Sequence, residues 1–255
     1  MYRPNRLKER LAAGRRSLGL WLNLADPTAA EIAAQAGYDF LLIDNEHGPG
    51  SLGDALRQLQ AISGSPATAL LRVPWNDPVY LKRALDIGVE AVMIPMCESA
   101  EQAKAAVAAC RYPPLGIRGY AAGRAADYGA AEDYVATAAE RLLIICQIES
   151  VRAVERVGEI AAVEGVDALF IGPYDLSGSV GKLRAFADPE VRATIARAEA
   201  GIRAAGKPMG TVPHGERGPA ELFETGYAMV AGSSDAGLLR AAARAEVASC
   251  RRYCE

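Results

Sequence analysis

The sequence predicts an α/β protein folded as a (β/α)8 TIM barrel. Eight short apolar segments alternate along the chain with longer, alanine-rich segments of helical periodicity. Two of the apolar segments, 40–43 and 168–171, are apolar at every position, which is typical of parallel strands covered on both faces. Eight such units in 255 residues fit one closed barrel, 1–255, better than an open sheet. An open doubly wound sheet is the alternative, although no Gly-x-Gly-x-x-Gly motif follows the first segment.

The expected elements follow one another regularly. The predicted strands are residues 18–23, 40–43, 69–73, 91–94, 142–148, 166–171, 207–212 and 228–231. Helical periodicity predicts helices over 52–62, 78–87 and 189–205. Asp77 and Asp188 each precede a proline, the pattern of an N-cap followed by proline at the first helical position. Gly88 and Gly206 are expected to end helices. The long connection 112–134 is expected to be functional or mobile.

Composition narrows the class of protein. The net charge is −3 and the basic residues are scattered, so nothing favours nucleic-acid binding. No apolar run approaches the roughly 18 residues of a membrane span, and residues 1–16 lack the apolar core of a secretory signal. Five scattered cysteines fit free thiols in a reducing compartment. We therefore expect a cytoplasmic protein that binds neither nucleic acid nor a membrane.

Active sites of such barrels lie at the C-terminal ends of the strands. Four expected strands end in polar groups. These are Asp44, Asn45, Glu46 and His47 after the second strand; Arg72 at the third; Gln147 and Glu149 at the fifth; Gly172, Pro173, Tyr174 and Asp175 after the sixth. The barrel would gather carboxylates, one histidine and one arginine on one rim.

Glu149 and Asp175 are the candidate metal ligands. A carboxylate at the mouth of an apolar barrel needs a partner or a cation. Two carboxylates plus waters suit Mg²⁺, Mn²⁺ or Co²⁺, whereas two histidines in the whole chain argue against a multi-histidine zinc site. Alternatively, Glu149 pairs with Arg72 and Asp175 caps a helix.

His47 is the candidate base, since its ordinary pKa lies near neutrality. A purely structural role for this histidine is the alternative. Asp86 could hold the imidazole of His47, although the residues alone favour an ordinary exposed helix position for it. Arg72 ends an apolar segment and is expected to bind a carboxylate or a developing enolate oxygen. None of the five lysines ends a strand, so a Schiff-base mechanism lacks its nucleophile.

These residues stand in motifs of a known family. The stretches LLIDNEH (41–47), RVPWND (72–77), RYPPLGIRG (111–119), QIE (147–149) and FIGPYDLS (170–177) resemble the class II pyruvate aldolases. That family includes the 4-hydroxy-2-oxoheptanedioate and 2-dehydro-3-deoxyglucarate aldolases. The resemblance covers about residues 11–245, with the motifs in the same order.

The resemblance implies a role for each matching position. It makes Glu149 and Asp175 the metal ligands, His47 the general base, and Asp86 the residue that sustains the basicity of His47. It makes Arg72 the residue that stabilises the enolate. The implied contacts to pyruvate come from Arg72, Gln147, Gly172, Pro173, Tyr174 and Asp175.

The implied reaction is reversible retro-aldol cleavage of 4-hydroxy-2-oxo acids to pyruvate and an aldehyde, through a pyruvate enolate held by a divalent Mg, Mn or Co ion. The resemblance also implies a homohexamer in which C-terminal helices, here 240–255, are exchanged. Asn45 replaces a common glycine, and the segment 120–128 looks closer to the sugar-acid branch. Arg118 or Arg124 could bind a distal carboxylate of the aldehyde.

Three alternatives stay open. A related acyl-CoA lyase or oxaloacetate decarboxylase would use the same enolate chemistry. A ligand-binding barrel would need none of it, and the intact set of polar residues argues against that. Residues 232–235 (GSSD) could bind phosphate at a helix N-terminus, but Ser234 or Asp235 as an ordinary N-cap explains them as well.

Overall fold

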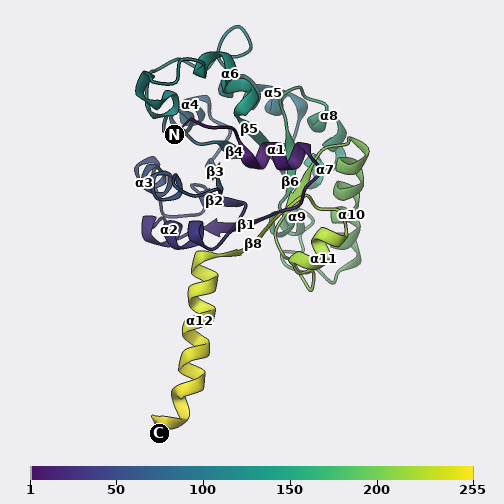
Figure 1. Cartoon of the computed structure of the whole chain (residues 1–255). Helices are drawn as coiled ribbons and strands as arrows, with labels where there is room; N and C mark the ends of the chain where they lie inside the picture. Colours follow the sequence, from purple (N-terminus) through teal and green to yellow (C-terminus); the bar gives the residue numbers. More distant parts are fainter. Residues whose placement is uncertain (1, 255) are drawn as a thin grey trace.

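A closed parallel barrel forms the body of the protein. The computed structural model describes residues 2–254. Its eight strands pair in chain order, and β8 closes the barrel against β1 (Figure 1). The strands are β1 (Ser17–Leu22), β2 (Phe40–Asp44), β3 (Thr68–Arg72), β4 (Ala91–Ile94), β5 (Leu143–Ile148), β6 (Ala168–Ile171), β7 (Met209–Thr211) and β8 (Met229–Ser234). The predicted barrel is confirmed and the open sheet is wrong.

Helices surround the barrel and begin where the sequence signals predict. They are α1 (Arg6–Ala12), α2 (Pro27–Gln35), α3 (Leu52–Ile62), α4 (Pro78–Asp86), α5 (Ala100–Cys110), α6 (Tyr134–Arg141), α7 (Val151–Glu155), α8 (Val157–Ala161), α9 (Pro173–Ser179), α10 (Pro189–Ala204), α11 (Pro219–Glu224) and α12 (Asp235–Cys250), with short 3-10 helices η1 (Arg124–Gly129) and η2 (Arg251–Tyr253). Asp77 and Asp188 cap α4 and α10 as predicted. Gly88 and Gly206 have positive φ after α4 and α10, as helix-ending glycines do.

Alternate strand residues fill the inside of the barrel. Phe40 and Leu42 of β2 belong to an inner cluster with Leu70 of β3, Ile145 of β5 and Phe170 of β6. Their neighbours in sequence point outward, because successive side chains of a strand face opposite sides. Large rings fit inside only beside glycine. A Cβ at Gly19 would lie 2.2 Å from the Phe40 ring.

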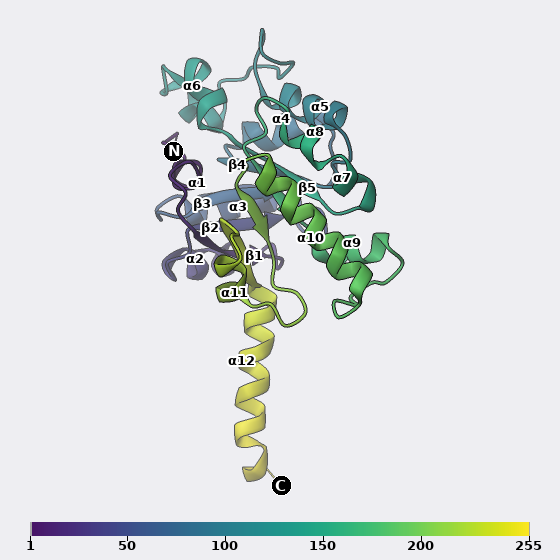
Figure 2. The same ribbon diagram turned by 90° about the vertical axis from the view of Figure 1, so that its right-hand side faces the viewer.

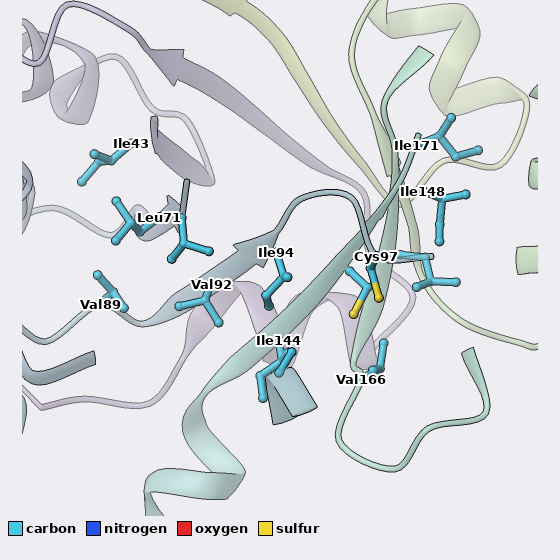
Figure 3. Packing of buried hydrophobic residues seen from close by; sticks show 14 of the residues in the cluster. Ile43, Leu71, Val89, Val92, Ile94, Cys97, Ile144, Ile148, Val166 and Ile171 are labelled. Carbon is cyan, nitrogen blue, oxygen red and sulfur yellow. The ribbon is translucent and has the colours of Figure 1, made fainter. Parts of the chain in front are cut away.

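A second core lies between the barrel and its helices. Ile43, Leu71, Ile94, Ile148 and Ile171 carry the outward-facing side of the strands into this core (Figure 3). All five side chains are at most 1% exposed. Burial on both faces explains why the strand segments are apolar at nearly every position.

Helix α1 closes the N-terminal end of the barrel, and the sequence analysis did not predict it. Leu7 and Leu11 are buried in the inner cluster. Asn5 caps the helix by accepting a hydrogen bond from the backbone N–H of Lys8. The signal was present in the chain: an N-cap residue followed by two leucines four positions apart.

Helix α12 leaves the barrel and projects away from it, as both views show (Figures 1 and 2). Every residue from Leu239 to Val247 is exposed. Of the segment 240–255 expected to pack on another subunit, residue 255 lies outside the described residues. Within residues 2–254, no helix is long and apolar enough to cross a membrane.

Candidate active site

The period of the strands places polar residues at the inner mouth of the barrel. Leu42 points inward from β2, so Asp44, two residues later, does too. The same argument takes Arg72 inward from Leu70 on β3, and Gln147 inward from Ile145 on β5. Apolar residues therefore fill the barrel toward the N-terminal ends of the strands, and polar residues occupy its C-terminal rim.

Asp44 is the centre of a buried hydrogen-bond network. Arg72 donates from Nε and Nη2 to its two oxygens at 3.0 and 2.8 Å. Trp21 Nε1 and Asn23 Nδ2 each donate to Oδ2 at 3.0 Å. The Asp44 side chain is fully buried. Although burial opposes it, the hydrogen bonds from Arg72 hold the pKa of Asp44 below its usual value.

Arg72 is held in one orientation by two carboxylates and a ring. Its Nη1 lies 2.7 Å from Glu46 Oε2, in addition to the two bonds to Asp44. Its guanidinium carbon lies 4.6 Å from the centre of the Trp21 ring. The alternative in which Arg72 pairs with Glu149 is wrong, because the residues described contain no such ion pair.

Glu149 follows β5 and is 3% exposed. Its Oε1 accepts a hydrogen bond from the backbone N–H of Met96 at 2.7 Å. Burial, together with the nearby carboxylates Glu46 and Asp175, raises the pKa of Glu149 to about 7. The carboxylate ion is therefore poorly compensated here, and a cation would stabilise it.

Asp175 lies in the first turn of α9, which begins at Pro173 directly after β6. The helix is not capped by a side chain, so the alternative role of Asp175 as a cap is wrong. Across residues 2–254, no hydrogen bond or ion pair involves the Asp175 carboxylate. The hydroxyl of Tyr174 donates to the carbonyl of Pro213 at 3.3 Å.

Gly172 leaves the space that Glu149 occupies. A Cβ on Gly172 would lie 2.6 Å from Glu149 Oε2 and 3.0 Å from Gln147 Nε2. Gln147 is 2% exposed, and its buried Oε1 has no hydrogen-bond partner in the part of the chain described. An unsatisfied buried amide oxygen beside a glycine gap indicates a place for a ligand.

An open cavity of about 590 Å³ lies at this rim, and Glu149 lies behind Gly172 in its wall rather than among the residues that line it. The cavity has the size of an ordinary small-molecule site. Seven of the residues expected at the site line it: His47, Arg72, Gln147, Gly172, Pro173, Tyr174 and Asp175. Asp44, which was expected at the rim without a role, lines the cavity too, and Trp21 and Asn23 are lining residues that were not expected. Period-2 alternation in β1 and β2 was the signal that could have found them.

His47 stands at the edge of the cavity, with its side chain 66% exposed. The backbone N–H of His47 donates to Asp44 Oδ1 at 3.3 Å, so the network that holds Arg72 also anchors the turn carrying His47. Its Nε2 lies 3.9 Å from Glu46 Oε2. A proton acceptor and the fixed guanidinium of Arg72 therefore border the same space.

Asp86 does not reach this rim. It is the last residue of α4, which runs back toward the N-terminal end of the barrel. Its Oδ1 accepts a hydrogen bond from Arg118 Nη2 at 2.8 Å, and no contact to His47 exists in residues 2–254. The expected contact between Asp86 and His47 is thus absent within one chain, and the effect of Asp86 on His47 stays a prediction. Arg124 donates to the carbonyl of Ile87 on the same side and does not line the cavity.

The segment 232–235 reaches the cavity and also caps a helix. Ser234 is the N-cap of α12 and accepts from the N–H of Gly237. Asp235 accepts from the N–H groups of Asn23 and Leu24, which ties the end of β1 to α12. The preferred interpretation of this segment as an ordinary N-cap is confirmed.

The donor set fits a hard divalent cation. Among residues 2–254, Glu149 Oε2 and the Asp175 carboxylate have no hydrogen-bond partner, and negative charge exceeds positive charge at the barrel mouth. The described residues contain no group of three or more His, Cys, Asp or Glu side chains arranged to hold a metal. Two carboxylates with the remaining positions open suit a cation that retains waters or binds substrate oxygens.

A parallel eight-stranded barrel with acid, base and guanidinium groups at its C-terminal mouth defines a TIM-barrel enzyme. Comparison with known proteins identifies its family. The model described as HpcH/HpaI aldolase/citrate lyase matches residues 17–242. The chain belongs to this family.

Individual relatives cover almost the whole chain. A 5-keto-4-deoxy-D-glucarate aldolase of Citrobacter koseri is 42% identical over 240 residues, which are 94% of this chain and 93% of that protein. A 4-hydroxy-2-oxo-heptane-1,7-dioate aldolase of Salmonella dublin is 43% identical over 243 residues, covering 94% and 92%. The crystal structure of a family member from Burkholderia cenocepacia has a TM-score of 0.93 at 39% identity, covering 97% of this chain and 99% of that one.

Proposed function

We propose that this protein is a divalent-metal-dependent aldolase that cleaves 4-hydroxy-2-oxo acids to pyruvate and an aldehyde, and catalyses the reverse addition. The observation that carries the proposal is that Asp175 and the fixed guanidinium of Arg72 line one cavity, and that Glu149 lies directly behind Gly172 in the wall of this cavity. Glu149 and Asp175 would hold the cation. A bound divalent cation supplies Lewis acidity, which stabilises negative charge on the oxygens of a 2-oxo acid.

The residues of this chain would bind and orient the 2-oxo acid. Gln147 and Gly172 line the cavity next to Glu149, and a small planar ligand would lie against them. Arg72 is already fixed by Asp44 and Glu46, so its guanidinium does not have to reorganise during the reaction. Donors fixed in this way stabilise charge that develops on an oxygen, and removal of one such donor typically costs about 3–4 kcal/mol.

His47 would move the proton. In the cleavage direction the 4-hydroxyl must lose a proton as the bond between C3 and C4 breaks, and C3 of pyruvate gains one later. His47 is exposed at the mouth of the cavity and can exchange protons with water. Its position at the edge rather than the base of the cavity fits a group that meets the aldehyde half of the substrate.

The residues that line the cavity argue against the main alternative function, that of a coenzyme A lyase. A nucleotide with several phosphates needs basic residues at the entrance, but Arg72 is the sole Arg or Lys among the residues that line the cavity, and its side chain is buried. Oxaloacetate decarboxylation passes through the same enolate and is therefore a second activity that the site could support.

The test is release of pyruvate from two substrates, 4-hydroxy-2-oxoheptanedioate and 5-keto-4-deoxy-D-glucarate, since relatives acting on each are almost equally similar. Cleavage of either with Mg²⁺, Mn²⁺ or Co²⁺ present would support the aldolase. Release of CO₂ from oxaloacetate without cleavage of any 4-hydroxy-2-oxo acid would replace it with a decarboxylase.

We also propose that the protein is a cytoplasmic homo-oligomer, a hexamer by family resemblance, in which α12 packs on another copy of the chain. Leu238, Leu239 and Val247 are 46%, 63% and 56% exposed on a helix that touches its own barrel only at its base. All five cysteines are free thiols, as expected in a reducing compartment. Light scattering should give the mass of six chains, and a monomer would contradict the assembly.

A further inference from the structure

A cavity lined by arginines lies at the opposite end of the barrel from the candidate active site. It is bordered by residues that precede strands, Glu90 before β4 and Leu142 before β5, and by the loop that follows α5. Four arginines line it, Arg3, Arg118, Arg124 and Arg141, against one carboxylate, that of Glu90. No step of the proposed reaction uses this cavity.

Three of the four arginines have carboxylate partners. Arg3 pairs with Glu90 at 2.6 Å, Arg118 pairs with Asp86 at 2.8 Å, and Arg141 pairs with Asp133 at 2.8 Å. Glu90 is thereby already neutralised, and the other two carboxylates do not line the cavity. The surplus charge at the cavity is positive.

Arg124 is the exception. It is 9% exposed, and within residues 2–254 no carboxylate lies within ion-pair distance of its guanidinium. Its Nη1 donates to the carbonyl of Ile87 at 2.7 Å, and its buried Nε has no acceptor. The buried Nε of Arg118, beside it on the cavity wall, is also without an acceptor.

A buried guanidinium without an ion-pair partner is costly, because solvation by water is lost and is replaced only in part. Its bond to Ile87, the C-cap of α4, offsets only part of this, since the end of a helix carries about half a unit of negative charge. Burial lowers the pKa of Arg124, and the nearby charges of Asp127 and Glu90 offset this only in part. Two arginines that line the cavity thus each hold a buried N–H group without an acceptor, and such groups are the donors that an oxyanion requires.

The size of the cavity limits the ligand. Its volume of about 50 Å³ exceeds the roughly 10–15 Å³ that one water needs, but is far below the roughly 300 Å³ of a site for larger molecules. A single phosphate, sulfate or carboxylate group matches this space. We propose that this cavity, between the end of α4 and the loop carrying Arg118 and Arg124, is a binding site for one small oxyanion such as inorganic phosphate.

Occupation would join the N-terminal segment, the end of α4 and the loop 112–134 through one ligand. The experiment is phosphate binding by the metal-free full-length protein, measured in EDTA at constant ionic strength by isothermal calorimetry and by thermal unfolding. EDTA removes the cation that could bind phosphate at the other end of the barrel. We expect saturable binding and a rise in Tm with phosphate but not with chloride.

The variant Arg124→Met should weaken phosphate binding at least tenfold and abolish the rise in Tm. The control Arg192→Gln changes an exposed arginine that likewise donates to a backbone carbonyl, that of Phe186, and should bind phosphate as the wild type does. If Arg124 serves only as a helix cap, Arg124→Met will lower Tm without phosphate, and the shift caused by phosphate will stay the same. That result would overturn the proposal.

If Arg124→Met does not fold, phosphate binding by the wild type and by Arg124→Lys is compared instead. Lysine keeps the charge but loses the fork of donors, so phosphate should bind several-fold more weakly. Equal binding by wild type and Arg124→Lys, or no phosphate binding by the wild type, refutes the site. The same measurement with acetate in place of phosphate tests whether a carboxylate is the preferred ligand. If acetate binds more tightly than phosphate and its binding also requires Arg124, the oxyanion site is supported with a carboxylate as its ligand.

Discussion

The substitution Asp44→Asn tests the network that fixes Arg72. Asn keeps the shape of Asp44 but removes its charge and presents an NH₂ group to donors. Asp44 accepts from two nitrogens of Arg72 and from Trp21 and Asn23, with its side chain fully buried. Loss of one partner of a buried ion pair costs about 3–5 kcal/mol. At roughly 2–4 °C per kcal/mol for a chain of this size, Tm should fall by about 6–20 °C.

Activity should fall as well, because the guanidinium of Arg72 would lose one of its two carboxylate partners and retain Glu46 and the Trp21 ring. A guanidinium that is less firmly held can shift by about 1 Å, and a misplacement of this size lowers the rate about 10²-fold. The assay is pyruvate release coupled to lactate dehydrogenase, alongside thermal unfolding. Asp39→Asn is the matched control, since Asp39 also pairs with an arginine, Arg10, at the other end of the same strand region. Full activity in Asp44→Asn, or an equal loss of activity in Asp39→Asn, would refute the reasoning.

Three further predictions follow from the site. The pKa of Glu149 is raised from 4.5 to about 7 without metal, so a proton competes with the cation below pH 7. The affinity for Mn²⁺ should therefore fall about tenfold per pH unit from pH 7 toward pH 5. An affinity that does not change with pH, measured by calorimetry, would contradict this. Gly172→Ala puts a Cβ 2.6 Å from Glu149 and should weaken Mn²⁺ binding at least tenfold; Gly178→Ala, whose Cβ would meet nothing nearer than 3.5 Å, should bind normally. His47→Gln should lower kcat by about 10²–10⁴ while Mn²⁺ affinity stays the same, and a variant with unchanged kcat would remove His47 from the mechanism.

The fold could be predicted from the sequence because each barrel strand is buried on both faces. Segments such as 40–43 and 168–171 then become apolar at every position, and the intervening helices carry their own signals in Asp77, Asp188 and the glycines that follow. Helix α1 escaped prediction because seven residues with only Leu7 and Leu11 on the buried side give too weak a period among charged neighbours.

The site could be predicted in part for the same reason. Residues at strand ends must meet at one rim, so Arg72, Gln147 and Asp175 could be grouped without coordinates. The partner of Arg72 could not be predicted, because the choice between Asp44 and Glu149 depends on where each side chain points inside the barrel. That Asp86 and Arg124 lie away from this rim within one chain could not be predicted either, since a helix end and a long loop carry no period that shows which end of the barrel they reach.

The most direct test of the central claim is cleavage of a 4-hydroxy-2-oxo acid by wild type and by Glu149→Gln, after EDTA treatment and after Mg²⁺, Mn²⁺ or Co²⁺ is restored. The account predicts that pyruvate release by the wild type stops with EDTA and returns with a divalent ion, and that Glu149→Gln stays inactive at ordinary metal concentrations. Pyruvate release that persists in EDTA, or a Glu149→Gln variant as active as the wild type, would contradict it.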